Sequence, residues 1–280
     1  MRREPVRVGR RTSVLMAIAG AITVLAFGWP LVIEPVAGVE HAGDAPLLFA
    51  LVIPLVMALV VSQMSDGGMD AKAVAMLGVL SALGAGLRPL GAGIGGIEPV
   101  FFLLIIAGRV FGPGFGFVVG ATTLLASGLL TGGVGPWLPF QMLAAAWVGL
   151  GAGLLPRAAG RTEIGLLAAY GVVSSLLFGL AMNLSFWPFT LGPDTAVSFM
   201  PGAPIGDNLR RFLLFDLTTS LGWDVGRSIT TALLVLVFGS PILRILRRAA
   251  RRAAFDRPVV FVDPAQTPAA SPASVSESIS

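Results

Sequence analysis

The chain has 280 residues, of which 55% are hydrophobic and 12% charged, and its mean hydropathy is +0.86. So few charges cannot cover a soluble protein of this size, and the composition therefore predicts an all-α integral protein of the lipid bilayer. The absence of cysteine and the single histidine exclude disulfides and His/Cys metal clusters. The basic excess is almost all arginine at the two chain ends, without interleaved aromatic residues. This pattern is typical of membrane orientation and not of nucleic-acid binding.

Apolar runs of spanning length predict about eight transmembrane helices. They lie near residues 12–33, 46–64, 71–88, 98–111, 114–131, 137–156, 163–187 and 217–246. The fourth and fifth are short and are joined by the sequence FGPGFG. A helical hairpin that tilts or is partly shielded from lipid therefore explains them as well as two full spans do.

Charges between these segments predict that both chain ends are cytoplasmic and that the protein is a multi-pass protein of the cell membrane. Residues 1–11 form a basic N-terminus, and a further group of arginines follows the last span. Four basic residues fall in loops that alternation makes cytoplasmic: Lys72, Arg109, Arg157 and Arg161. Four others fall on the predicted outer side: Arg88, Arg210, Arg211 and Arg227. The Pro/Ala/Ser-rich tail, residues 253–280, is predicted to be disordered.

Matches to nucleotide-binding and catalytic motifs are weak. The sequence GAGIGG at 91–96 satisfies the glycine spacing of a dinucleotide-binding loop, but no soluble strand precedes it. Lys72, the only lysine, is flanked by alanines and cannot belong to a P-loop, so an ATP-driven role would need partner proteins. Asp66 and Asp70 have the D-x-x-x-D spacing of a magnesium-diphosphate motif, but the second acidic motif that such a site needs is missing from the sequence. We therefore expect no catalytic residues, no metal and no cofactor.

Small residues recur every four positions in three segments, which produces smooth helix faces where other helices can approach closely. The first stripe consists of Gly78, Ala82 and Gly86; the second of Gly112, Gly116 and Gly120; the third of Gly149 and Gly153. For any one stripe, packing inside the chain's own bundle is the simpler interpretation. Three stripes together also fit a protein that docks against other membrane proteins.

Polar and aromatic residues from distant parts of the sequence gather on the predicted outer side. They are Arg88, Glu98, Trp137, Gln141, Asn183, Trp187, Asp216, Trp223, Asp224 and Arg227. Each has a structural explanation: a helix N-terminus for Glu98, mutual pairing for Asp224 and Arg227, and an interfacial belt for the tryptophans. As a group they predict a small-molecule site, because ionisable residues at this depth are expensive unless they are paired or used.

The stretch GGVGPWLPFQML at 132–143 supplies one wall of this predicted site. Pro136 and Pro139 remove backbone donors where the chain turns, and Trp137 and Gln141 lie one helical turn apart. Trp137 could then stack on a ring and Gln141 could hydrogen-bond a polar edge. A proline-capped turn with an interfacial tryptophan is an equally good interpretation.

Residues 71–252 resemble the substrate-binding membrane subunits, or S-components, of energy-coupling-factor (ECF) vitamin transporters. The resemblance rests on the order of AVAMLGVLSALGAGLRPLG, the block FGPGFGFVVGATTLLASGLLTGGVGPWLPFQMLAAAWVGLGAGLLP and the last helix GWDVGRSITTALLVLVFGSPILRILRR. It implies a six-helix bundle that captures a vitamin near its outer face, closed by the loop from Arg88 to Glu98. It also implies partners: a transmembrane coupling subunit and two ATPase subunits.

The chain departs from this family in two ways. Residues 12–66 carry two additional transmembrane helices before the six-helix bundle. The family's docking motif matches Gly78-x-x-x-Ala82, with Gly86 one turn further on, but Ala17-x-x-x-Ala21 in the first segment also fits. We favour the third segment, because the loop and the following block are in register with it.

Among the vitamins of this family we lean to cobalamin, because the resemblance is closest there and the outer loop at 188–212 is long. No residue is diagnostic of the substrate. The alternative is a stand-alone secondary transporter, which would need a coupling carboxylate near the membrane midplane and, typically, an inverted repeat. Neither is evident in the sequence. A structural or assembly membrane protein is the third hypothesis.

Overall fold

The computed structural model describes residues 9–28, 50–51, 53–56, 58–59, 61–62, 71–91, 94–190, 195–200 and 202–253. Within these ranges every regular element is a helix. The predicted all-α class is therefore confirmed for the described part of the chain. The start of the basic N-terminus, residues 1–8, and the tail from residue 254 onward lie outside it, as do Asp66 and Asp70 of the weak acidic motif.

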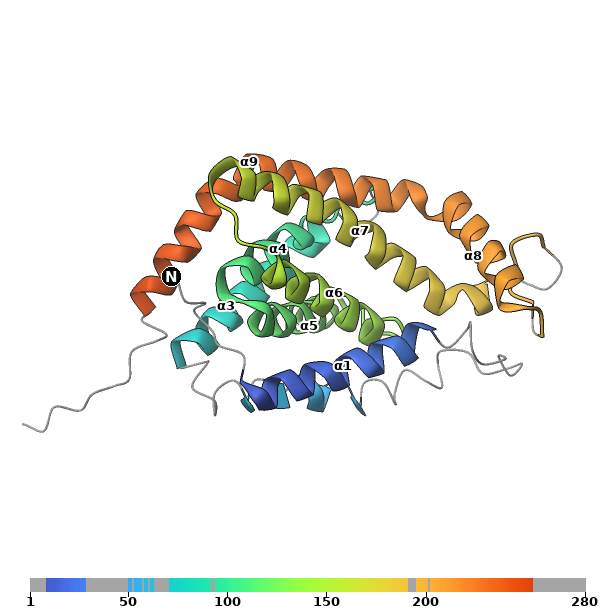
Figure 1. Ribbon diagram of the computed structural model, residues 1–280, viewed down its shortest axis with the longest axis horizontal. Coiled ribbons are helices and arrows are strands. Elements are labelled where there is room, and N and C mark those ends of the chain that lie inside the picture. The colour runs from blue at the N-terminus through green and yellow to red at the C-terminus, as the bar shows by residue number, and fades with distance from the viewer. Residues whose placement is uncertain are drawn as a thin grey trace, which may run out of the picture.

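The helices follow the apolar segments closely (Figure 1). Their bounds are α1 Arg10–Gly28, α3 Ala71–Leu87, the short 3-10 helix η2 Arg88–Gly91, α4 Val100–Phe111, α5 Pro113–Thr131, α6 Leu138–Leu154, α7 Gly160–Thr190, α8 Ile205–Thr219 and α9 Leu221–Ala253. The described residues between 50 and 62 are also helical, within the second predicted span.

Five helices of the described chain are long and apolar enough to cross a membrane: α1, α3 with η2, α5, α7 and α9. This fits a multi-pass membrane protein. The apolar helices α4 and α6 are shorter, with 12 and 17 residues. The prediction that the fourth segment is short is confirmed. The fifth was also expected to be short, but α5 is long enough to cross a membrane, and the other short helix is α6. A short α4 is tolerated because it is almost completely buried among the other helices and does not need to match the bilayer thickness by itself.

The centre of the bundle is the packing of α4, α5 and α6, where glycines bring backbones into direct contact. A Cβ atom at Gly116 would overlap the backbone carbonyl of Gly149, and one at Gly120 would overlap that of Ala145. Gly153 likewise faces the backbone at Gly112 and Pro113. The second and third small-residue stripes are therefore used for packing inside the chain, as the simpler interpretation predicted.

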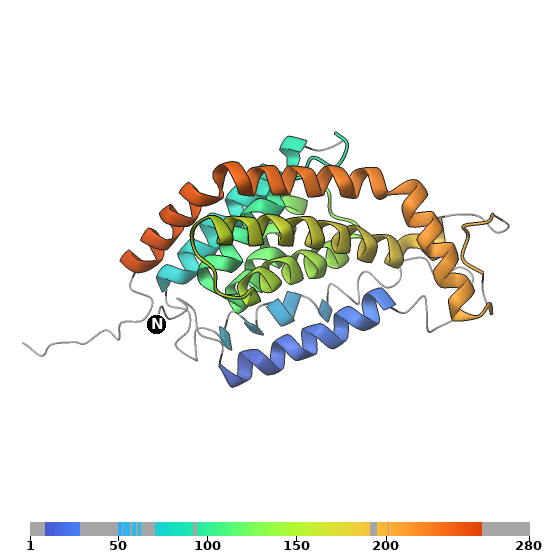
Figure 2. The ribbon, with the colours of Figure 1, turned by 45° about the horizontal axis from the view of Figure 1, so that its top comes forward.

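Two long helices, α7 and α9, run side by side along one face of this centre (Figure 2). Gly171 of α7 makes room for Thr231 of α9, since a Cβ atom there would overlap the threonine methyl group. A short amphipathic helix, α8, precedes α9. The sequence predicted a long outer loop over 188–212, but α8 begins within this range. The helix was not predicted because its apolar residues are too interrupted to form a spanning run.

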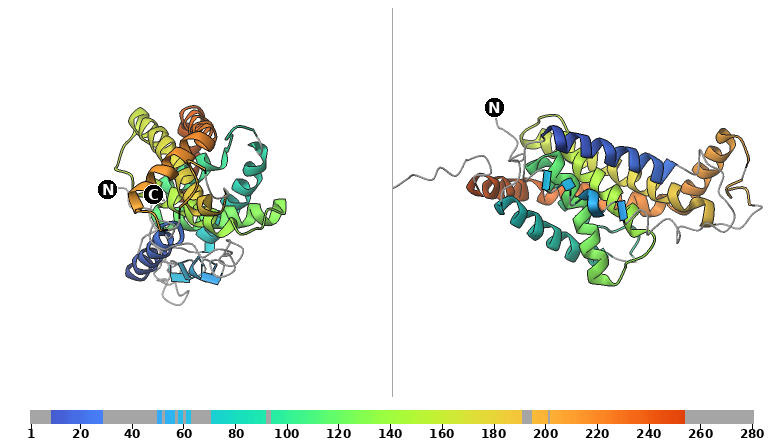
Figure 3. Two further views of the ribbon diagram at one scale, coloured as in Figure 1. Left: turned by 90° about the vertical axis from the view of Figure 1, so that its right-hand side faces the viewer. Right: turned by 90° about the horizontal axis from the view of Figure 1, so that it is seen from below.

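The first helix lies on another face of the bundle, together with the described helical residues between 50 and 62 (Figure 3). It packs against α6 and α7, and its Thr23 hydroxyl accepts a hydrogen bond from the indole nitrogen of Trp147 at 2.8 Å. Gly20 lies against the same tryptophan ring. The first helix is thus attached to the rest of the bundle by a specific contact.

Some charged residues that were expected in loops lie inside helices, and Arg109 is the most buried of them. Arg109 was expected in a loop, but it lies in the last turn of α4 with its side chain 8% exposed. The helix continues past it because Val110 and Phe111 extend the buried apolar face. Its charge is compensated by a carboxylate on α7.

Replacing Gly116 by alanine should destabilise the protein. The alanine Cβ would collide with the backbone carbonyl oxygen of Gly149, which cannot move aside. The free energy of unfolding should therefore fall by about 1–3 kcal/mol or more, as is typical of core overpacking. Thermal unfolding of the detergent-purified protein measures it. Gly78→Ala is the matched control, because a Cβ at Gly78 meets nothing within 4 Å. Equal midpoints for the two variants would contradict this packing.

Candidate functional site

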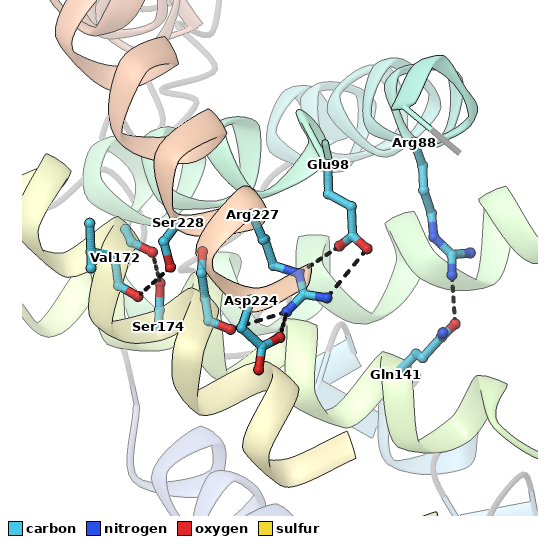
Figure 4. Close-up of polar contacts among 10 residues, drawn as sticks. Arg88, Glu98, Gln141, Val172, Ser174, Asp224, Arg227 and Ser228 are labelled. Carbon is cyan, nitrogen blue, oxygen red and sulfur yellow. Dashed lines mark hydrogen bonds and ion pairs between the residues drawn. The ribbon is translucent and has the colours of Figure 1, made fainter. Parts of the chain in front are cut away.

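A buried arginine, Arg227, lies at the centre of the polar residues gathered at one end of the bundle (Figure 4). Its guanidinium donates to Glu98 at 2.9 Å and to Asp224 at 2.6 Å. A third bond runs to the backbone carbonyl of Ser175 on α7 at 3.2 Å. Arg227 therefore joins α9, α7 and the segment just before α4, three regions distant in the sequence.

The surroundings of Arg227 explain how a charge is tolerated there. Asp224 lies one turn away in the first turn of α9 and fits against Gly179 of α7, where any Cβ atom would collide with the carboxylate. The rings of Phe101 and Phe178 face the guanidinium, with centroids 5.5 Å and 5.0 Å from its central carbon. Two carboxylates and two aromatic faces replace the lost hydration of one cation.

The glycine-rich segment before α4 rests directly on the start of α9. Gly96, at φ +79°, contacts the backbone of Trp223 and Arg227, so that a side chain at this position would collide with them. From the other side, Gly226 makes room for the carbonyl of Gly95. Gly95 and Gly96, the last two residues of the GAGIGG sequence, thus form a close backbone contact with α9, and the Glu98–Arg227 ion pair follows two residues later.

A second polar contact lies near this cluster. Arg88, at the start of η2, donates a hydrogen bond to the Gln141 side-chain oxygen on α6 at 2.7 Å. Arg88 forms no ion pair among the described residues, although its charge interacts with that of Glu98. Figure 4 shows the two arginines on either side of Glu98. The predicted residues Arg88, Glu98, Gln141, Asp224 and Arg227 therefore come together at one end of the bundle.

The side chains of the other predicted residues take no part in these contacts. Asn183 donates to Asp216 of α8 at 2.6 Å. Trp187 is completely buried against Phe212 and Phe215, and its indole nitrogen donates to the Val197 carbonyl at 2.7 Å, so it packs α8 onto α7. Trp137 and Trp223 are 44% and 46% exposed. Exposed tryptophans at a helix start suit a membrane interface or a site open to solvent.

Several buried hydroxyl groups were not singled out from the sequence. Ser175 and Thr231 lie near Arg227, while Thr123 and Ser127 lie one turn apart on α5. None of their hydroxyls has a hydrogen-bond partner among the described residues. The sequence offered one indication of Thr231: it follows Arg227 by four residues, which places both side chains on one face of α9.

A second buried charge cluster lies at the opposite end of the α7–α9 pair. Glu163 accepts from Arg109 at 2.8 Å and from Arg247 at 2.6 Å. Arg109 also donates to the Leu155 carbonyl. This cluster ties α4, α7 and α9 together, as Arg227 does at the other end, and it was not predicted because its members lie near three different predicted loops.

The first small-residue stripe differs from the other two. Gly78, Ala82 and Gly86 are exposed, and Cβ atoms added at the two glycines would meet nothing within 4 Å. Ala17 and Ala21 of α1 are exposed as well. Both segments considered for docking therefore keep a small-residue face uncovered by the described chain.

The described residues contain no group of three or more His, Cys, Asp or Glu side chains that could hold a metal ion. The site consists of guanidinium, carboxylate and amide groups, which bind and orient a ligand by hydrogen bonds and charge. No known protein family, curated protein or solved structure matches this chain significantly.

Replacing Arg227 by methionine should lower the free energy of unfolding by about 3–5 kcal/mol, because two carboxylates would lose their cation in a buried site. Thermal unfolding measures the loss. Arg248→Met, an exposed arginine on the same helix, is the control and should change little. The triple variant Glu98→Gln, Asp224→Asn, Arg227→Met should recover most of the stability; failure to recover would argue that packing by the arginine, not charge, holds the site.

Proposed function

We propose that the protein is the substrate-specific membrane subunit of an ECF-type importer. In this proposal it captures a vitamin at the end of the bundle that carries Arg227, and delivers it through a coupling subunit and two ATPases. The supporting observation is the convergence of η2, the 94–98 segment, α6 and α9 on one polar cluster, in the order that the resemblance implies. Cobalamin is the substrate we favour.

The contact between the 94–98 segment and α9 supports a lid. The segment is held by two glycine contacts and by the Glu98–Arg227 pair, and Glu98 is the more exposed partner at 32% against 8%. Opening would expose Arg227 and leave Asp224 as its remaining carboxylate. A ligand with polar groups could then bind at the position that Glu98 occupies in the closed arrangement.

The uncovered stripe on α3 supports docking of a coupling subunit. A smooth face lets a partner helix approach closely, and close approach supplies van der Waals contact where no hydrophobic effect drives association in lipid. The stripes on α5 and α6 are occupied by the chain's own backbone and are not accessible.

The alternative, a stand-alone secondary transporter, is less well supported. The acidic side chains of the described residues lie outside the helices or near helix ends: Glu98, Glu163, Asp207, Asp216 and Asp224. A coupling carboxylate is expected near the membrane midplane. The buried carboxylates of both clusters are moreover paired with arginines.

Native mass spectrometry of the tagged protein, purified in mild detergent from its own host, tests the proposal. We expect a bound vitamin together with coupling and ATPase subunits. Gly78→Leu should remove the partner subunits and keep the ligand, because it adds bulk only to the uncovered stripe. Gly165→Leu, at an exposed glycine of α7 that also faces open space, is the matched control. A folded preparation with neither ligand nor partners would overturn the proposal.

Ligand affinity gives a separate prediction for the polar cluster. Gln141→Ala should weaken vitamin binding at least about tenfold, because it removes the amide that orients Arg88. Isothermal titration with the vitamin found in the native preparation measures this. Thr218→Ala, on the exposed surface of α8, should bind as the wild type does. Unchanged affinity in Gln141→Ala would place the ligand elsewhere.

A further inference from the structure

A groove runs between the first turns of α1 and the described helical residues at 58–62, far in the sequence from the polar cluster. Its volume is about 560 Å³. The lining residues are Arg10, Arg11, Val14, Leu15, Ala58, Val61 and Ser62. Apolar side chains therefore form the walls, and two guanidinium groups lie at one end.

The length of α1 places these arginines at headgroup depth. The helix has 19 residues, which at 1.5 Å per residue is about 28 Å, close to the thickness of the hydrocarbon core. If α1 spans the bilayer, its first residues, Arg10 and Arg11, reach the headgroup region. Val14 and Val61 then face acyl chains, and both are more than half exposed.

The charges at this end of the groove are uncompensated within the described chain. Neither Arg10 nor Arg11 forms an ion pair among the described residues, and the first turn of α1 contains no acidic residue. Two cations also lie at the positive end of the helix dipole, where an anion is favoured and a cation is not. A bound anion would compensate both arginines at this helix end.

The base of the groove is fixed. Thr12 and Ser62 are buried and their hydroxyls share a hydrogen bond at 3.1 Å, which holds the two helical segments together beneath the arginines. The groove is thus a gap between two helical segments that are joined to each other.

We propose that this groove binds an anionic phospholipid, with the phosphate on Arg10 and Arg11 and one acyl chain along Val14, Leu15 and Val61. Basic pockets between membrane helices select anionic headgroups, and the apolar walls select a lipid over a free anion. This site is independent of the vitamin site and of the coupling partners. The lipid attaches the first two helical segments to one leaflet.

Native mass spectrometry of the full-length protein, delipidated and titrated with phosphatidylglycerol or phosphatidylcholine of identical acyl chains, tests the proposal. Phosphatidylglycerol should bind about twenty-five-fold more tightly, roughly fivefold for each arginine. The double variant Arg10→Gln, Arg11→Gln should reduce this ratio to near one. Val61→Trp, which fills the groove, should weaken the binding of both lipids at this site.

The control is Arg244→Gln, Arg248→Gln, which removes the same charge from exposed positions on α9 and should keep the wild-type ratio. All variants must elute and unfold as the wild type does. A wild-type ratio near one would overturn the proposal, as would equal losses in the two double variants. Inorganic phosphate binding as tightly as phosphatidylglycerol would also overturn it, because the acyl chain would then contribute nothing.

Discussion

The arrangement of the polar end depends on the charge of Arg227. A guanidinium held in a membrane bundle must keep its partners, because losing one carboxylate leaves an uncompensated charge away from water. Arg227 therefore fixes the register of α9 against α7 through Ser175, and the position of the 94–98 segment through Glu98. The glycines at 96, 179 and 226 follow from this constraint, because they allow the backbones and the Asp224 carboxylate to come close enough.

The α7–α9 pair carries a buried charge cluster at each end, and the two clusters differ in a way that bears on function. At the Glu163 end one carboxylate is held by two arginines, and all three side chains belong to helices. At the Arg227 end one partner, Glu98, belongs to a non-helical segment and is partly exposed. Segments outside helices open at lower cost than packed helices. If the protein opens to admit a ligand, the Arg227 end is where the lower cost lies.

Much of the fold was predictable from the sequence, because apolar runs bounded by glycine and proline carry most of the information. The bounds of α3, α5 and α7 follow their runs to within a few residues. The amphipathic helix α8 was missed because its apolar residues are interrupted by Asp207, Arg210 and Arg211, as expected for a helix with only one buried face. The number of spans stays a prediction beyond the five long apolar helices.

Half of the ten residues that the sequence singled out come together at the polar end, but their pairings were not predictable. Hydropathy alternation places Glu98 and Arg227 at one depth, but it does not say which residues touch across 129 positions of sequence. Trp187 shows what hydropathy cannot tell. It was predicted at the same depth as Glu98 and Arg227, yet its side chain packs α8 onto α7. The Glu163 cluster was missed for the same reason, since Arg109 and Arg247 belong to different predicted loops.

The packing of α1 bears on whether a partner can reach the α3 stripe. A helix that precedes α3 in the sequence could have covered Gly78 and Gly86, which would have left no smooth face for another subunit. Instead α1 packs on α6 and α7, fixed by the Trp147–Thr23 hydrogen bond, and both glycines of α3 face open space. Within the described chain, the additional helix is thus compatible with docking through α3, and it adds a surface of its own on another face of the bundle.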